Sequence, residues 1–211
     1  DENIKAGMVK LQNFQRPDGG FNYWPGAQEP DDWSTNYAGH FLLEAQNNGY
    51  YISDNMLQGF KNFQKGKANN WVPTTTHFYG GDLTQAYRLY TLALAKAPEL
   101  GAMNRLKEFK YLSPEAKWRL AAAYQLAGQA TIALDLSSGL PTSFEQRLNP
   151  GFTYGSSLRD QAMVLETLTL MGNRKKAAEV LASVAGQLSQ DNWYSTQTTA
   201  YSLIAIAKYC G

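Results

Sequence analysis

The sequence is poor in the side chains that form disulfides and bind transition metals. Among its 211 residues it has one cysteine, Cys210, and two histidines. A single cysteine cannot form an internal disulfide or a thiolate metal cage. A zinc site would need carboxylates to complete it, and the histidines lack the HExxH type of spacing. We therefore expect no metal and no cofactor.

Long apolar runs and an excess of one charge are also missing. The formal net charge is +1, which gives no reason to expect nucleic acid or anionic lipid as a partner. No apolar run approaches the roughly 20 residues of a membrane helix, and the opening residues DENIKAG lack the basic and apolar regions of a signal peptide. We expect a chain that is soluble as given and does not insert into a membrane. A leader removed earlier would leave the same sequence.

The bulk composition is that of an ordinary globular domain. Hydrophobic residues make up 44% of the chain and charged residues 18%. At this length the chain can bury a sizeable core. We interpret residues 1–211 as a single domain.

The stretch from Gln15 to Ala45 holds one complete structural unit. Residues 17–20, PDGG, supply a fixed φ and positions that tolerate positive φ, which predicts a chain reversal. Aromatic residues over 21–24 alternate partly, which predicts a short extended or hairpin-like connector. The acids at 31–32 then place hydrogen-bond acceptors and negative charge at the start of an amphipathic helix.

Apolar residues at helical spacing, bounded by glycine, proline and capping residues, predict a chain of helices. Two loops are expected, at 66–81 and at 140–154. The expected helices cover 3–14, 31–47, 53–63, 82–96, 103–109, 114–128, a segment ending at 136, 157–171, 175–188 and 195–209.

These helices alternate between two compositions. Apolar, crowded helices such as QAYRLYTLALAK and QAMVLETLTLMG are followed by polar ones such as NRKKAAEVLASVAGQL. Breaks after the crowded helices, at Gly49, Pro98, Gly128 and Gly172, lie 49, 30 and 44 residues apart, which argues against a solenoid of fixed period. The pattern favours an all-α fold in which helical hairpins close into a ring, with one apolar helix inside and one amphipathic helix outside in each pair.

Three stretches resemble one protein family. They are LQNFQRPDGGFNYW with the downstream DDWSTNYAGHFLLEA, then SSLRDQAMVLETLTLMGNRKKA, then NWYSTQTTAYSLIAIAKY. Together they resemble the thioester-containing domain of α2-macroglobulins and complement components, in particular the bacterial branch. The turn QRPDGGF alone is less specific, because squalene cyclases and prenyltransferases have similar turns. The residues that carry the motif are Gln15, Asp18, Gly19, Gly20, Phe21, Trp24, Trp33, Arg159, Asp160, Trp193, Ser195, Thr196 and Gln197.

The resemblance implies an α/α toroid of paired helices, terpenoid-cyclase-like in architecture, whose first helices would lie before residue 1. It implies a fragment of a larger multidomain chain whose partners are the other domains of a parent macroglobulin and the proteases that it traps. The domain would act by conformational change and not as an enzyme. The resemblance also implies that the protein lies in the periplasm or otherwise outside the cytoplasm.

The family's acylating chemistry needs a Cys-x-Glu-Gln turn, because the cysteine sulfur must reach the glutamine carbonyl three residues on. Cys210 is followed only by Gly211, so these residues cannot build the thioester. Either the motif lies upstream of residue 1 or the parent protein belongs to a branch without it.

We expect different roles for the two histidines. His77 precedes an expected helix in TTTHFYGGD, and the resemblance makes it a candidate for assisting acyl transfer, as against an ordinary loop histidine. His40 lies within a helix between Gly39 and Phe41 and is interpreted as a packed or surface residue.

An enzyme on the same ring is the main alternative. Asp31 and Asp32, with Asp82 or Asp160 opposite, would be the acids of a glycan-active enzyme, and helix capping is the competing interpretation. Aromatic residues would line a sugar or isoprenoid cavity or else fill the ends of the ring. These aromatics are Tyr23, Trp24, Trp33, Tyr37, Trp71 and Tyr79. A plain helical-repeat scaffold with a free concave face is the third possibility.

Overall fold

The computed structural model describes residues 1–73, 81–145 and 153–211. Over these residues the fold is all helical, with ten α-helices and no named strand, which confirms the expected fold class. His77 and Tyr79 lie outside the described residues. The helices are α1 (Glu2–Gln12), α2 (Asp32–Asn47), α3 (Asp54–Asn70), α4 (Gly81–Leu94), α5 (Leu100–Lys107), α6 (Pro114–Leu126), α7 (Ala130–Ser137), α8 (Ser157–Leu170), α9 (Arg174–Leu188) and α10 (Thr196–Cys210).

Capping residues explain where four of the helices, α2, α6, α8 and α10, begin. The side chains of Asp31, Ser113, Ser156 and Ser195 each accept a hydrogen bond from a backbone N–H in the first turn of the helix that follows. Pro114 stands at the first position of α6, where its missing N–H costs nothing. These caps are local in sequence, so the expected helix starts agree with the structure to within a few residues.

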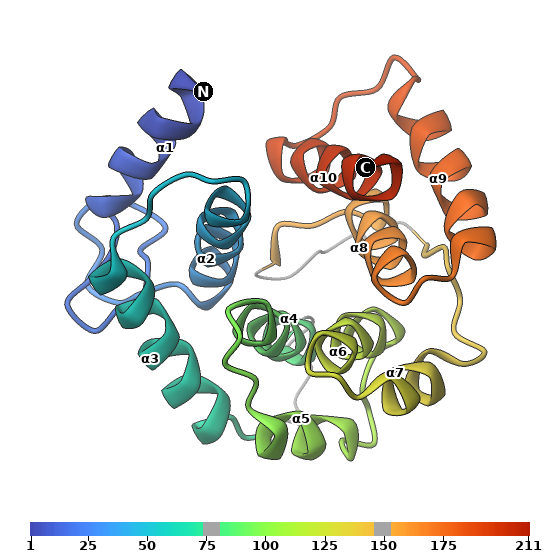
Figure 1. Cartoon of the computed structure of the whole chain (residues 1–211), viewed down its shortest axis with the longest axis horizontal. Helices are drawn as coiled ribbons and strands as arrows, with labels where there is room; N and C mark the ends of the chain where they lie inside the picture. Colours follow the sequence, from blue (N-terminus) through green and yellow to red (C-terminus); the bar gives the residue numbers. More distant parts are fainter. Residues whose placement is uncertain (74–80, 146–152) are drawn as a thin grey trace.

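The helices form two layers around a common centre. Figure 1 shows the even-numbered helices α2, α4, α6, α8 and α10 around the middle and the odd-numbered helices outside them. The crowded sequences form the inner layer, because α4, α6 and α8 have buried side chains almost all round, whereas α1 has none. The closed toroid, with further helices outside the sequence given, stays a prediction.

The main core lies where α4, α6 and α8 pack together. Tyr87, Tyr90, Trp118 and Tyr124 are among its largest fully buried side chains, and small alanines of α6 let the helices approach closely. Full burial of a large apolar side chain stabilises a fold by about 1.5–3 kcal/mol. Among the described residues, none of the helices is both long enough and apolar enough to cross a membrane.

The expected loop at 66–81 is wrong over its first part. Helix α3 continues to Asn70, in spite of Gly66, because tertiary contacts hold its last turns. Ala68 is completely buried, and its carbonyl oxygen accepts hydrogen bonds from Gln85 of α4 and Arg105 of α5. Contacts with two later helices outweigh the weak helix propensity of this segment.

The predicted reversal after α1 is present and is fixed by glycine. Gly19 has a φ of +93°, and a Cβ atom there would lie 2.0 Å from the carbonyl oxygen of Gly59 in α3. The side chain of Gln15 donates to the carbonyl oxygens of Gly19 and Met56. Gln15 and Phe21 form an isolated β-bridge, so the connector is hairpin-like over these residues.

Candidate functional site

A buried ionic network lies between the inner helices, around Glu166 of α8. This side chain is 2% exposed, yet its carboxylate accepts hydrogen bonds from Arg119 of α6 at 2.6 Å, from Lys208 of α10 at 2.7 Å and from the Tyr90 hydroxyl of α4 at 2.9 Å. Charged hydrogen bonds of this kind are the stronger ones. The network therefore joins four inner helices at one carboxylate.

The fifth inner helix, α2, contributes His40 and Glu44. The His40 Nε2 atom lies 3.3 Å from Glu44 Oε1 and 3.8 Å from Glu166 Oε1. Its Nδ1 atom lies 3.0 Å from the Tyr87 hydroxyl. Lys208 also forms an ion pair with Glu44, so one ammonium group connects α10 to both α2 and α8.

Mutual neutralisation holds these groups in their charged forms. Burial by itself would raise the pKa of Glu166, but the positive charges of Lys208 and Arg119 lower it well below its ordinary value. Burial opposes the charge of Lys208 in the same way, but Glu166 and Glu44 raise its pKa. The pKa of Glu44 is lowered overall. Burial alone would raise it, but the interactions with His40 and Lys208 lower it more strongly. The network is thus a matched set of buried charges.

His40, Glu44 and Glu166 have donor atoms close enough together to hold a metal ion, within 4.8 Å of one another. Lys208 Nζ, however, contacts the same two carboxylate oxygens that face His40 Nε2. The ammonium therefore stands in the position that a cation would take. We interpret the three residues as an ion-pair network and not as a metal centre.

A second buried cluster brings together motif residues from all three family-like stretches. Arg159 pairs with Asp160 at 2.6 Å and donates to the Gln197 side chain at 2.8 Å. It also donates to the Thr153 carbonyl oxygen and lies over the Trp33 ring at 4.6 Å from its centroid. This arginine therefore connects α2, α8 and α10 beside the central network.

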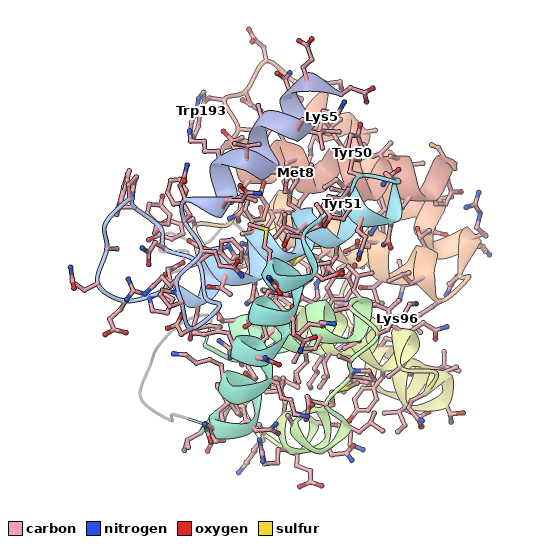
Figure 2. The ribbon with its side chains drawn as sticks, turned by 60° about the vertical axis from the view of Figure 1, so that its left-hand side comes forward. Lys5, Met8, Tyr50, Tyr51, Lys96 and Trp193 are labelled. Atoms are coloured by element: carbon pink, nitrogen blue, oxygen red, sulfur yellow. The ribbon has the colours of Figure 1, made fainter. Side chains whose placement is uncertain are left out.

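The other predicted motif residues lie apart from this cluster. Ser195 caps α10, and Phe21 is buried with its N–H donating to Thr35. Trp24 is 68% exposed, and Trp193 is 89% exposed at the edge of the molecule in Figure 2. Asp18 accepts from Gly20 N within the opening turn. The remaining motif residues, Gln15, Gly19, Gly20 and Thr196, belong to that turn or to the first position of α10.

The four aspartates considered for catalysis are each engaged by separate partners. Asp31 caps α2, Asp32 pairs with Arg88, Asp160 pairs with its neighbouring arginine, and the Asp82 carboxylate accepts from a backbone N–H at the start of α6. No two of these carboxylates share a partner in the described contacts. The geometry gives no support to a paired-acid mechanism.

A groove opens beside the central network, between α1, α2 and α10, which lie together in the upper part of Figure 1. Its volume is about 840 Å³. Aromatic side chains line it, among them Phe14, Tyr37, Phe41, Tyr154 and Tyr201. Of the aromatics expected to line a cavity, Trp33, Tyr37 and Tyr23 do so, whereas Trp71 packs against Phe109 at a different place.

The sequence interpretation missed the ionic network. The sequence does contain one signal of such a network, which is a charged residue within each of three apolar helical runs. These residues are Arg119 in WRLAAAY, Glu166 in MVLETLTL and Lys208 in LIAIAKY. A charge on a helix that is otherwise buried needs a partner. Sequence alone, however, does not say which charges meet.

Comparison with known proteins shows which sequences this chain is similar to. No protein-family model matches the chain. The alpha-2-macroglobulin of Escherichia coli strain K12 is 26% identical to it over 208 residues, which is 92% of this chain and 12% of that protein. The alpha-2-macroglobulin of Xylella fastidiosa strain Temecula1 is 27% identical over 214 residues, or 93% of this chain and 13% of that protein.

Solved structures show the same architecture. Native alpha-2-macroglobulin from Escherichia coli, in a crystal structure spanning domain MG7 to the C-terminus, superimposes with a TM-score of 0.83 at 23% identity, covering 98% of this chain and 34% of that one. The trypsin-activated protein of the same organism gives a TM-score of 0.78 at 24% identity, covering 96% and 14%.

Over the described residues the fold is all helical, and it matches a helical part of solved bacterial alpha-2-macroglobulins. More particularly, the chain is homologous to the C-terminal region of bacterial alpha-2-macroglobulins, which confirms the family resemblance. The chain spans only about an eighth of the length of these relatives, which are much larger proteins.

Proposed function

We propose that this chain is the thioester-type domain of a bacterial macroglobulin-like protein and contributes to protease trapping by changing its position within a larger multidomain chain. The observation that carries this proposal is the sequence match to macroglobulins of two species over more than nine tenths of the chain. The partners would be neighbouring domains of the parent chain and the proteases that cut it. The parent protein would lie outside the cytoplasm, as the family resemblance implies.

The domain would move as a rigid body. Its fold resembles both the native and the trypsin-activated Escherichia coli protein, with TM-scores of 0.83 and 0.78, so one arrangement of helices fits both forms. The buried network supports such rigidity, because moving the inner helices apart would separate Glu166 from Arg119 and Lys208. Exposing or unpairing buried charges costs several kcal/mol.

Within the residues given, the contribution would be mechanical. The 211 residues contain no Cys-x-Glu-Gln turn. The four aspartates considered for a glycan-active enzyme are each engaged in a helix cap, an ion pair or a hydrogen bond to the backbone. The domain would therefore act as a displaced module and not as an enzyme.

The test uses the full-length product of the gene that encodes this chain. The protein is treated with trypsin, and the bound trypsin is assayed with a small peptide substrate and with casein. Trapping predicts that activity on the small substrate is kept while activity on casein falls, because the enclosed protease excludes large substrates. Trypsin inactivated at its active site is the control and should leave the protein unchanged.

Hydrogen exchange on the same samples tests the part played by this domain. Amides of α4, α6 and α8 should exchange equally slowly before and after cleavage, while surface segments such as that around Trp193 should change as neighbouring domains move. Loss of protection in α6 or α8 would contradict rigid-body movement. Trypsin that keeps full activity on casein would contradict trapping.

A further inference from the structure

We propose that Asn48, at the end of α2, is a site of spontaneous deamidation, and that this modification loosens the last turn of the helix. Asn48 is followed by Gly49, and in the whole sequence it is the only asparagine that precedes a glycine. Asparagine is among the thermolabile residues, because the backbone nitrogen of the next residue can attack its side-chain amide. Glycine has no Cβ atom to hinder that attack or to restrict the backbone.

The reaction needs only water as a co-reactant. The Gly49 nitrogen attacks Cγ of Asn48, so an N–Cγ bond forms and the Cγ–Nδ2 bond breaks. The side-chain nitrogen leaves as ammonia, with the proton that the Gly49 N–H gives up, and a succinimide ring remains. Water then opens the ring at one of its carbonyl carbons, which leaves aspartate or isoaspartate at position 48. Nothing is oxidised or reduced.

The pair of residues lies at an open position of the fold. Asn48 and Gly49 are both exposed. A Cβ atom at Gly49 would meet no atom within 4 Å in the described part of the chain, so the reacting groups are not crowded. Asn36 of the same helix is buried, by contrast, and its side chain donates to the Thr84 carbonyl oxygen. Both the following residue and the surroundings therefore single out Asn48.

The hydrogen bonds of the helix end control the rate. The Gly49 N–H donates to the Gln46 carbonyl oxygen at 3.0 Å, and the Asn48 side chain donates to the Glu44 carbonyl oxygen at 2.8 Å. While both bonds are formed, they hold the attacking nitrogen and the side-chain amide in separate directions. Helix ends fray, and exposed terminal bonds open at a small cost in free energy. The reaction therefore proceeds from the opened end of α2.

Deamidation removes one of the bonds that close this helix. The Asn48 amide group donates to the Glu44 carbonyl oxygen, whereas a carboxylate can only accept. The new negative charge also lies at the end of α2, where the helix dipole favours positive charge. Glu44 belongs to this last turn, and its side chain pairs with Lys208. The loosened turn is thus the one that connects α2 to the ionic network.

The test uses the full-length product of the gene, folded and kept at mildly alkaline pH, where the attacking nitrogen loses its proton more readily. Mass spectrometry of chymotryptic peptides that contain residues 44–50 detects the replacement of an amide by a carboxylate. Asn48 should deamidate at least about tenfold faster than Asn47, which is also exposed but is followed by asparagine. Asn48→Gln should suppress the reaction at this position, because its longer side chain closes a ring less readily.

Two aspartate variants test the loosening of the helix. Asn48→Asp has the same side chain as one product, and hydrogen exchange of the amides over residues 44–50 should become about two- to tenfold faster in it. Asn47→Asp adds the same charge one residue earlier and keeps the bond from Asn48 to the Glu44 carbonyl oxygen, so its effect should be smaller.

Two results would overturn the proposal. One is an Asn48 side chain that stays intact in the folded protein or reacts no faster than Asn47, because the helix end would then not open to the reaction. The other is equal hydrogen exchange in the two aspartate variants, because the lost donor would then have no effect. Neither measurement involves a protease, so both are independent of the trapping proposal.

Discussion

Replacing Lys208 by methionine removes the ammonium group that neutralises two carboxylates between the inner helices. Glu44 loses Lys208 and keeps its contact with His40, while Glu166 keeps Arg119, the Tyr90 hydroxyl and the more distant His40. Methionine keeps most of the aliphatic volume, so the change isolates the charge. We expect the free energy of unfolding to fall at neutral pH.

The magnitude follows from the burial of the three groups. Removing one partner of a buried ion pair costs about 3–5 kcal/mol, because a charge is left unpaired. Here Lys208 is 25% exposed, Glu44 is 18% exposed and Glu166 retains one cation, so solvent and Arg119 reduce the loss. We expect about 2–4 kcal/mol, or a fall in melting temperature of about 4–16 °C for a chain of this size.

The pH dependence has a definite sign. Because the folded-state pKa of Glu166 and Glu44 is lowered, these groups stabilise the fold above their unfolded pKa, near 4.3, and lose that contribution as pH falls through the folded pKa. The pKa of Lys208 is raised, so its contribution is present below an unfolded pKa near 10.4 and disappears as pH rises through the folded value. The defect of Lys208→Met should therefore be largest between about pH 5 and 10 and should shrink as pH falls below about 4.3, where the glutamates of the unfolded chain take up protons.

Urea unfolding followed by circular dichroism at pH 7 and pH 3 measures the effect. Lys175→Met changes an exposed lysine of α9 and should cost no more than about 0.5 kcal/mol. Adding Glu44→Gln to Lys208→Met should restore part of the lost stability, since it removes one unpaired charge. A defect equal to that of the control, or one that stays the same at both pH values, would refute the reasoning.

Three further predictions concern the opening turn, the arginine cluster and the cation position. Gly19→Ala should destabilise by more than about 2 kcal/mol in urea unfolding, because its Cβ would meet the Gly59 carbonyl, while Gly26→Ala, with positive φ but open space, should cost about 1 kcal/mol. Arg159→Lys should cost about 2–3 kcal/mol, because lysine cannot reproduce the branched set of hydrogen bonds, and an unchanged melting temperature would count against the cluster. Zinc should raise the melting temperature of Lys208→Ala and leave that of the unchanged protein where it is, as thermal melts with and without chelator can show.

Which helices form, and in which layer each lies, depended mainly on local patterns. Ser113-Pro114 and the serine before α10 mark helix starts that neighbouring backbone groups alone can satisfy. The contrast between apolar and polar helices indicated the inner and outer layers, because a helix that is apolar all round must be covered by others. The first departure came at α3, where burial of Ala68 extends a helix through a segment with loop composition.

The candidate site was predictable only in part. Arg159 and Asp160 could be named from the sequence as motif residues, but the contacts of Arg159 with Trp33 and Gln197 form only when three separate helices meet. The groove likewise depends on the angle between α1 and α10, which no sequence pattern expresses.

The sequence by itself determined a chain of capped helices of two kinds, because periodicity and capping are interactions between residues a few positions apart. Only the tertiary structure decided that Glu166, Arg119 and Lys208 neutralise one another, since these charges are 42 or more positions apart and meet only after the inner helices pack together. A buried charge is stable only beside a neutralising partner, and the packing of the helices determines which partner that is.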